Sequence, residues 1–387
     1  MAFSQIQQIR GERSVSEVKA CRNASSRGRP PRAFHALRAG AALVCLLAGA
    51  RTVTAQAYTV TALGTLGGGT AFPHGINNAG QVVGESALPG DSITHAFLWE
   101  NGVMRDLGAL GGVLSMAISI NDAGQVVGLS SIEATGADLP GQLHPFLYDG
   151  TGMHDLGTLG DGDGAAFDIN AAGQVVGYSG GHSFLYGPSG LHDLPNTLGG
   201  PAIWASGIND LGQIVGTSTG TDFLYAAHAV LYDRGVMHDL GALLSYGRSA
   251  ARRINAAGQV TGNADAPVPV VTQPPSLYTT DAFLYDHGKM HDLGTLGGEF
   301  SVALGMNAAG QVVGHSLPAT GELLHAFLYS DGVMNDLNSL IPTNSSWSWY
   351  SAADINDHGQ IVAFGGGRAF LLTPKTPLSP SGAPSPP

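Results

Sequence analysis

Apolar and polar residues alternate over short stretches of this chain, and turn-forming residues separate the stretches. Residues 58–63 (Tyr-Thr-Val-Thr-Ala-Leu) alternate in this way before Gly64 ends the run. Alternation with a period of two is typical of a strand with one buried face, and Gly marks the turn that follows. The sequence therefore predicts many short strands joined by tight turns, in agreement with its 57 glycines and its charged fraction of only 12%.

One nine-residue motif organises the rest of the chain. Residues 76–84 read Ile-Asn-Asn-Ala-Gly-Gln-Val-Val-Gly, and the Asn, Gly and Gln return six more times, at spacings from 39 residues (Asn170 to Asn209) to 52 residues (Asn255 to Asn307). Self-similarity at such a period indicates a repeat architecture. The seven copies are Asn77/Gly80/Gln81, Asn121/Gly124/Gln125, Asn170/Gly173/Gln174, Asn209/Gly212/Gln213, Asn255/Gly258/Gln259, Asn307/Gly310/Gln311 and Asn356/Gly359/Gln360.

Each repeat predicts four strands, which we name A to D. Strand A ends at the Ile-Asn of the motif, and Asn-x-x-Gly then closes a turn, because Asn favours its first position and Gly accepts a positive φ. Strand B is Gln-Val-Val-Gly, strand C is the aromatic run at residues 95–99, and strand D is Met-Arg-Asp-Leu at residues 104–107. One copy of strand C has Val230 in place of Phe, beside an extra Phe-Leu-Tyr at residues 223–225.

The order of these strands predicts how the chain closes. It reads D, then A-B-C-D six times, then A-B-C, so seven four-stranded units form only if the first strand joins the last three. Small residues at strand A, such as Ala117 and Gly207, suit an innermost strand near an axis. The sequence therefore predicts an all-β fold over residues 58–373, a seven-bladed β-propeller closed by the N-terminal strand.

The repeat unit also resembles a known family. His-Ala-Phe-Leu-Tyr, Gly-x-Met-x-Asp-Leu-Gly and Ile-Asn-x-x-Gly-Gln-Val-Val-Gly are similar to the repeats of the bacterial extracellular HAF repeat family. The resemblance covers roughly residues 58–373 and implies export and a repeat fold. It implies no agreed activity and transfers no catalytic residue.

The two ends of the chain differ in composition from the repeats. Residues 1–57 carry nine of the 17 basic residues, then an apolar run at residues 39–50 and the small-residue pattern Ala55-Gln56-Ala57, which together predict a signal peptide cleaved after Ala57. The apolar run is shorter than the about 20 residues that a membrane span needs. Residues 374–387 are rich in Pro and Ser and predict a disordered tail. We expect a secreted or periplasmic protein.

Charge and cysteine content narrow the chemistry of the exported part. Both cysteines, Cys21 and Cys45, lie in the leader, so thiol and disulfide chemistry is excluded after cleavage. Residues 58–387 retain 8 of the 17 basic and 27 of the 29 acidic residues, a formal charge of −19. Such a polyanion repels nucleic acid and anionic lipid. We therefore expect no nucleic-acid partner and no membrane insertion after cleavage, and we expect a monomer.

The repeated polar residues predict structural roles rather than a catalytic site. Equivalent positions in neighbouring blades are separated by roughly the 10 Å between packed sheets, too far for one zinc ion to collect several histidines. We therefore interpret these histidines as hydrogen-bonded structural groups, and Asn, Gly and Gln as parts of the A–B turn. The histidines are His95, His144, His182, His228 and His325 before strand C, and His154, His192, His238 and His291 in strand D.

Residues that break the repeat are the better candidates for function. They concentrate on the face that carries the B–C and D–A loops, where aromatic rings beside local cations suit a glycan, peptide or carboxylate. Packing between blades is the alternative for each aromatic. Metal ligation is indicated only weakly, by an acidic turn with Asp161, Asp163 and Asp168, and no cofactor is indicated. The ligand-binding candidates are Trp347, Trp349, Tyr350, Trp204, Tyr246, Phe300, Arg248, Arg252 and Arg253.

These features favour a secreted, non-catalytic binding or scaffold propeller. An extracellular glycan-active hydrolase or lyase is the first alternative, because glycosidases work with two carboxylates at short range. The sequence contains no nucleophile elbow, phosphate loop or Cys/His metal spacing that would support this alternative. A structural surface repeat protein without a small ligand is the second alternative.

Overall fold

The computed structural model of the protein describes residues 58–133, 141–196, 198, 203–218, 227–267, 279–321, 323–340 and 348–375. The chain divides into two compact units, Met1–Thr54 and Ala55–Pro387, and every described residue belongs to the second. The predicted leader and the tail beyond Lys375 lie outside the described residues. Within the described ranges no helix is both long and apolar enough to cross a membrane.

The described residues form antiparallel sheets built from consecutive strands A to D. Strands A and B of each unit are joined by the Asn-x-x-Gly turn. The A strands are β2 (Ala71–Ile76), β6 (Ser115–Ile120), β10 (Gly164–Ile169), β14 (Ile203–Ile208), β18 (Ser249–Ile254), β22 (Gly297–Met306) and β26 (Ser351–Ile355). The B strands are β3 (Val82–Ala87), β7 (Val126–Ser131), β11 (Val175–Ser179), β15 (Ile214–Ser218), β19 (Val260–Ala266), β23 (Val312–Pro318) and β27 (Ile361–Gly365).

The aromatic strand C follows strand B and pairs with a short strand D. The C strands are β4 (Thr94–Glu100), β8 (Leu143–Tyr148), β12 (His182–Gly187), β16 (His228–Asp233), β20 (Thr279–Asp286), β24 (His325–Ser330) and β28 (Arg368–Pro374). The D strands are β5 (Val103–Asp106), β9 (Met153–Asp155), β13 (Gly190–Asp193), β17 (Val236–Asp239), β21 (Lys289–Asp292), β25 (Val333–Asp336) and β1 (Tyr58–Ala62), and a 3-10 turn, Leu337–Ser339, follows β25. These strands confirm the predicted pattern of four strands per repeat.

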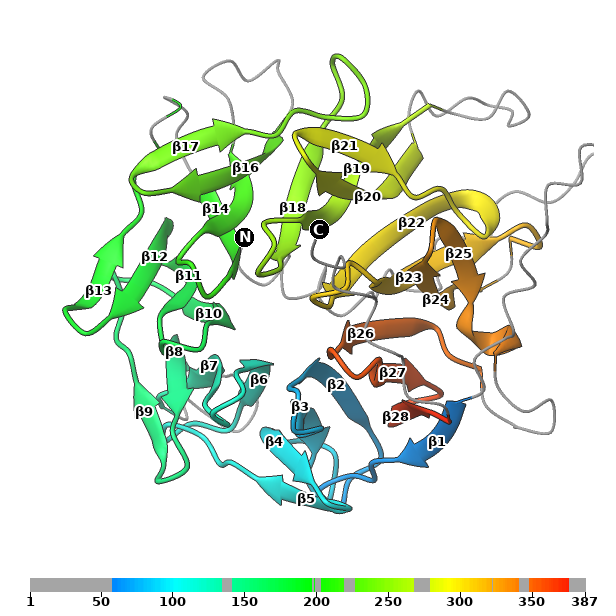
Figure 1. The fold of residues 1–387 in the computed structure, drawn as a ribbon. Coiled ribbons are helices and arrows are strands. Elements are labelled where there is room, and N and C mark those ends of the chain that lie inside the picture. The colour runs from blue at the N-terminus through cyan, green and yellow to red at the C-terminus, as the bar shows by residue number, and fades with distance from the viewer. Residues whose placement is uncertain are drawn as a thin grey trace, which may run out of the picture. The chain divides into compact units, whose positions relative to one another are not determined.

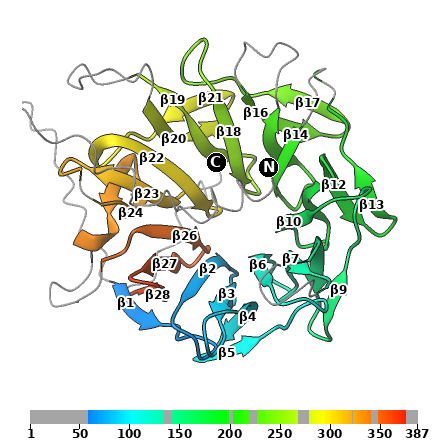
Figure 2. The same cartoon turned by 180° about the vertical axis from the view of Figure 1, so that it is seen from behind.

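The sheets lie around a common centre, with strand A innermost and strand D at the rim (Figures 1 and 2). Neighbouring A strands contact one another, including β2 with β6 and β2 with β26. Most units are separate sheets, while β18–β21 and β22–β25 are linked by one parallel bridge between Thr280 and Phe300. This radial arrangement of four-stranded antiparallel sheets is a β-propeller.

The N-terminal strand pairs with the last strand of the chain. β1 is antiparallel to β28, with Tyr58 opposite Pro374 and Ala62 opposite Phe370. The ladder continues past β1, because the Leu63 N–H donates to the Ala369 carbonyl over 3.0 Å. Tyr58 is 1% exposed, and burial raises the pKa of its phenol to about 12. The sheet therefore has the strand order β1-β28-β27-β26 and uses residues from both ends of the described chain.

The hydrophobic core lies between neighbouring sheets. One cluster joins Phe97 and Val82 to Val362 and Leu371 of the preceding sheet, and each of these residues is at most 5% exposed. The repeated Gly of strand B makes room for the aromatic residue of strand C, since a Cβ on Gly84 would lie 2.9 Å from the Phe97 ring and 2.0 Å from a backbone oxygen of strand A. A side chain on Gly84 would therefore clash with strands A and C, although the last sheet has Ala363 at the equivalent position.

The repeated Asn joins each unit to the next. The Asn77 Nδ2 donates to the Asn121 carbonyl over 3.0 Å and to the Gln81 side chain, while its Oδ1 accepts from the Gln81 N–H. Gly80 closes the turn with φ of 77°. The same Nδ2 bond to the next Asn carbonyl continues from Asn121 to Asn170, Asn170 to Asn209, Asn209 to Asn255, Asn255 to Asn307, Asn307 to Asn356 and Asn356 back to Asn77.

Candidate ligand-binding site

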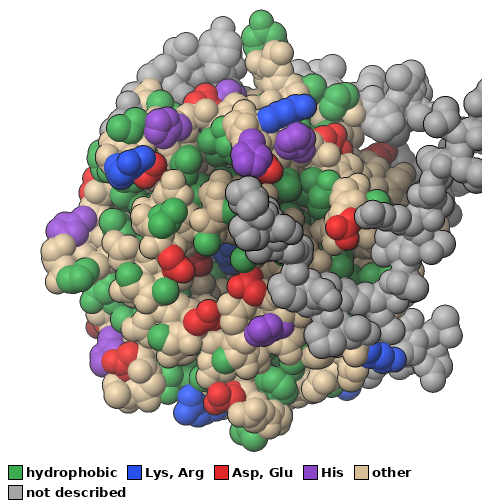
Figure 3. All heavy atoms as spheres, in the orientation of Figure 1, with side chains coloured by type: hydrophobic (Ala, Val, Ile, Leu, Met, Phe, Trp, Pro, Cys, Tyr) green, Lys and Arg blue, Asp and Glu red, His purple; other side chains and the backbone are tan. Residues whose placement is uncertain are grey.

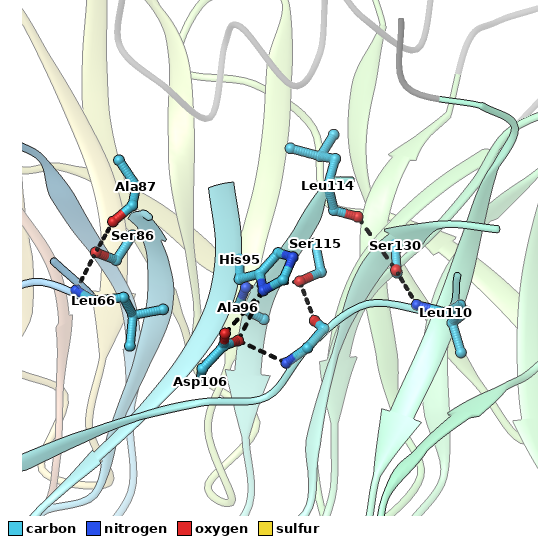
Figure 4. Close-up of polar contacts among 11 residues, drawn as sticks. Leu66, Ser86, Ala87, His95, Ala96, Asp106, Leu110, Leu114, Ser115 and Ser130 are labelled. Atoms are coloured by element: carbon cyan, nitrogen blue, oxygen red, sulfur yellow. Dashed lines mark hydrogen bonds and ion pairs between the residues drawn. The ribbon is translucent and has the colours of Figure 1, made fainter. Parts of the chain in front are cut away.

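The histidines of strand C bond the aspartates of strand D within the same sheet. The His95 Nδ1 lies 2.9 Å from Asp106 Oδ1, and Asp106 also accepts the Gly108 N–H (Figure 4). This agrees with hydrogen-bonded structural histidines. Sequence analysis missed the partner, although a constant spacing of 11 residues between His and Asp could have revealed it. The other pairs are His144–Asp155, His182–Asp193, His228–Asp239 and His325–Asp336.

One sheet replaces this histidine with a second carboxylate. Asp281 of β20 stands where five other sheets have His and the last sheet has Arg368, eleven residues before Asp292 of β21. Asp281 is 9% exposed, and its Oδ1 is buried without a hydrogen-bond partner. Burial, and then the charge of Asp292, raises the pKa of Asp281 to about 7. The pair therefore carries an electrostatic penalty that the His–Asp pairs avoid.

Trp349, one of the predicted ligand-binding residues, is buried. Trp349 is 0% exposed, and its ring packs edge to face against Phe370 at 6.3 Å between centroids. The Trp349 backbone is held by Asn338, which accepts its N–H and donates to its carbonyl. This residue fills the core, so its assignment to ligand binding was wrong. Tyr350 is half-buried, and Trp347 lies outside the described residues.

Two other predicted aromatics contact rings of neighbouring strands. Trp204 of β14 stacks on Tyr178 of β11 with centroids 4.5 Å apart. Phe300 of β22 packs edge to face against His315 of β23 at 6.4 Å. Both are half-buried, so each offers a ligand at most part of its surface. Packing between blades, the alternative considered for each aromatic, describes Trp204, whereas Phe300 packs within its own sheet.

Tyr246 and Arg248 remain accessible in the segment between β17 and β18. The Gly247 N–H donates to the Leu244 carbonyl, which places Tyr246 at the tip of a tight turn, and Tyr246 is 81% exposed. The Arg248 side chain is 69% exposed, yet its Nε lies 3.2 Å from Asp265 of β19. Asp265 also accepts the Arg248 N–H over 2.9 Å, so this carboxylate fixes the base of an exposed aromatic and cationic pair.

Arg252 and Arg253 lie further along the same segment, on the innermost strand β18. Arg253 Nη1 donates to the Ser206 carbonyl of the neighbouring strand β14 over 3.3 Å. Burial raises the pKa of Asp354 on β26 to about 6, and the Arg253 guanidinium opposes this rise. Acidic and basic side chains meet near the centre of the face in Figure 3. The inner strands thus bring together charged residues that are far apart in the sequence.

The predicted acidic metal site is not assembled. Asp168 accepts hydrogen bonds from the Ser119 hydroxyl and from the Ile208 N–H, while Asp163 accepts the Leu143 N–H. Asp161 is exposed. In the part of the chain that the structure describes, no three His, Cys, Asp or Glu residues form a group that could hold a metal ion. Asp163 and Asp168 instead bond to neighbouring strands and to the loops between them.

Comparisons with known proteins support no assignment of function. No protein-family model matches the sequence, and no curated protein matches it. Similar solved structures include TolB from Acinetobacter baumannii, at 13% identity and a TM-score of 0.37. The match covers 61% of this chain and 60% of TolB. They also include the β-propeller domain of the Trilobed protease from Pyrococcus furiosus (11% identity, TM-score 0.46, 71% of this chain and 82% of that one). A streptogramin B lyase is similar at 9% identity and a TM-score of 0.45, over 82% of this chain and 98% of that one. At these values no activity is transferred to the present chain.

Proposed function

We propose that the sheets are the seven blades of a closed propeller, in which β1 completes the blade of β26, β27 and β28. The pairing of β1 with β28 and the chain of Asn bonds that returns to Asn77 support this proposal. Both features join the first repeat to the last one, so they support closure of the ring at this junction. A closed ring has no free sheet edge between its first and last blades, which favours stability outside the cell.

We further propose a secreted or periplasmic protein of the HAF repeat family that binds a glycan or peptide without catalysing a reaction. The repeated polar residues form hydrogen bonds within the protein: Asn in the turns, and His and Asp in strands C and D. Residues available for recognition are therefore those that depart from the repeat, on the face of the B–C and D–A loops. N-terminal sequencing of the exported protein tests the first part, with Tyr58 as the expected first residue.

The observation that carries the binding proposal is the pair Tyr246 and Arg248. An aromatic ring that is 81% exposed stands two residues from a cation fixed by Asp265, on a protein whose exported part is strongly acidic. Flat rings contribute large contact areas, and guanidinium groups bind carboxylates with two parallel hydrogen bonds. An acidic oligosaccharide or a peptide with a free carboxylate satisfies both groups at once.

Hydrolysis is less well supported than binding. A glycosidase needs two carboxylates that can reach one sugar. Asp168 and Asp354, two of the acidic residues of the inner strands, each accept a backbone N–H from a neighbouring inner strand, from Ile208 and Ile76 respectively. These hydrogen bonds give both carboxylates a structural role.

Arrays of acidic and neutral glycans, together with short peptides, test the proposal on the exported protein. Tyr246→Ala and Arg248→Ala should each weaken binding at least roughly ten-fold, the loss expected when one well-placed contact is removed. Val103→Ala is a matched control, because Val103 is 66% exposed and lies on another sheet. Binding unchanged in both variants, or substrate turnover that disappears in Asp354→Asn, would contradict a non-catalytic site at this segment.

A further inference from the structure

Arg252 occupies a special position on β18. The register of β18 and β19 shifts between Ala251 and Arg253, so Arg252 is the extra residue of a β-bulge. The other A strands have the same bulge, and the residues there are His74, Ile118, Phe167, Ser206, Leu304 and Ala353. A bulge redirects a side chain out of the regular ladder. Arg252 is therefore the only arginine at a bulge shared by all the inner strands of the described residues.

Among the described residues, Arg252 forms no ion pair with a carboxylate. Its Nε is buried and has no hydrogen-bond partner, whereas the residue as a whole keeps part of its surface accessible. Burial, with a smaller contribution from Arg253, lowers the pKa of Arg252 to about 10. No carboxylate among the described residues counteracts this lowering. The adjacent Arg253, by contrast, bonds a carbonyl and interacts with Asp354.

The other titratable neighbour of Arg252 is a neutral histidine. Burial, and then the charge of Arg252, lowers the pKa of His315 to about 4. The His315 Nδ1 lies 3.2 Å from the Ser351 hydroxyl, and its ring packs against Phe300. At neutral pH this histidine adds no positive charge. The neighbours whose charge interacts with that of Arg252 are therefore the neutral His315 and the cation Arg253.

A buried guanidinium N–H without a partner is costly, because its desolvation is not repaid by an acceptor. We propose that Arg252 is the anchor of an anion-binding site on β18, which takes the carboxylate group of a small acidic ligand. This inference rests on the proposed binding function and adds to it the charge of the ligand and the residue that holds it. The bound carboxylate provides the missing acceptor for the Arg252 N–H donors.

A carboxylate suits this site better than a larger anion. The guanidinium presents its N–H donors in a plane, and a carboxylate accepts two of them side by side. The exported part of the chain has a formal charge of −19, which repels polyanions and favours a ligand with a single negative charge. A uronic acid residue of a glycan or the terminal carboxylate of a peptide meets these conditions.

Thermal unfolding and calorimetric titration of the exported protein test this site with sodium glucuronate as the probe. Glucose is the neutral match, and inorganic phosphate tests a different anion. Glucuronate should raise the Tm by a few degrees, on the order of 3 °C at saturating concentration, and glucose should not. Arg252→Gln should abolish this rise and weaken binding at least roughly ten-fold, without lowering the Tm of the ligand-free protein. Arg234→Gln, at an arginine whose side chain is 90% exposed in the turn between β16 and β17, should leave glucuronate binding unchanged.

Several outcomes would overturn the site. They are a parent protein that glucuronate does not stabilise, a rise that survives Arg252→Gln, stabilisation by phosphate alone, and a ligand-free Arg252→Gln protein with a clearly lower Tm. If Arg252→Gln fails to fold, Arg252→Lys keeps the charge without the planar fork, and an undiminished affinity in that variant would refute carboxylate recognition. The proposed function and the anion site at Arg252 can be refuted independently of each other. Glucuronate binding through Arg252 without binding of any larger glycan or peptide refutes only the proposed function, while neutral glycans bound independently of Arg252 refute only the anion site.

Discussion

Asp281 makes the stability of this protein depend on pH, and one substitution should remove that dependence. In the other sheets with a polar pair at this place, a histidine bonds the strand D aspartate, but Asp281 faces Asp292 with a buried oxygen that has no partner. The pKa of Asp281 is raised to about 7 from 3.8, chiefly by burial. Asp281→Asn keeps the shape of the side chain and removes its charge.

The sign of the effect follows from the direction of this shift. A carboxyl whose folded-state pKa is raised binds its proton more tightly in the folded state, so stability is full below about pH 4 and is lost as the pH rises to about 7. The difference between 3.8 and about 7 corresponds to at most about 4 kcal/mol. Solvent screening lowers the expected cost to about 2 kcal/mol, or roughly 4 °C in Tm for a domain of this size.

The assay is the Tm of parent and variant between pH 4 and pH 8. Asp281→Asn should match the parent at pH 4 and exceed it by about 4 °C at pH 8. Asp281→His should also gain stability at pH 8, because it restores the pair seen in the other sheets. His144→Asp is the matched control: it places a second carboxylate opposite Asp155 and should introduce the same loss.

Two results would refute this reasoning. One is a Tm difference between Asp281→Asn and the parent that stays constant from pH 4 to pH 8, since a titrating group must produce a change in that range. The other is a His144→Asp variant as stable as the parent at pH 8. Either would mean that the facing carboxylates are separated by solvent and do not interact.

The structure supports three further predictions. Asn121→Ala should cost about 2–3 kcal/mol in chemical denaturation, because it removes bonds to three backbone positions and leaves buried groups unpaired, whereas Asn78→Ala, at the exposed turn position after Asn77, should cost less. Phe97→Ala should cost about 3–5 kcal/mol by the same measurement, since the ring is fully buried, and Val103→Ala should be near neutral. Deletion of Tyr58–Ala62 should lower the Tm sharply and expose β28 to limited proteolysis; an unchanged melting curve would count against closure by β1.

The strands could be predicted from the sequence because every repeat has the same residue pattern. Residues 58–63 were expected to form a strand, and β1 spans Tyr58–Ala62. The copy with Val230 also forms a strand C, β16, where Val230 is fully buried. The bonds between units could not be predicted in the same way. The Asn77 amide reaches the carbonyl of a residue 44 positions away, and only the radial arrangement brings the two together.

Prediction of the site was less successful, for reasons that differ among the residues. Trp349 was taken for a surface ring because large rings crowd the segment around it, yet it fills the core beside Phe370. Arg252 was chosen for its proximity to Arg248 and Arg253 in the sequence, whereas the structure places it at a β-bulge with a buried Nε that has no hydrogen-bond partner. Asp281 is not among the candidates because these come from the face of the B–C and D–A loops, whereas Asp281 replaces a histidine on strand C.

These three residues indicate how a departure from a repeat should be read. Trp349 leaves a buried indole N–H without a partner, but the group is neutral, and such a loss costs about 1–3 kcal/mol, which packing of a large ring can offset. Asp281 and Arg252 leave buried oxygen and nitrogen atoms on groups that carry charge, for which the cost of desolvation is greater. The carboxyl can relieve its cost by taking up a proton near neutral pH, so Asp281 needs no ligand. A guanidinium cannot give up its proton in this range, so of the three it is Arg252 whose environment requires a partner from outside the described chain.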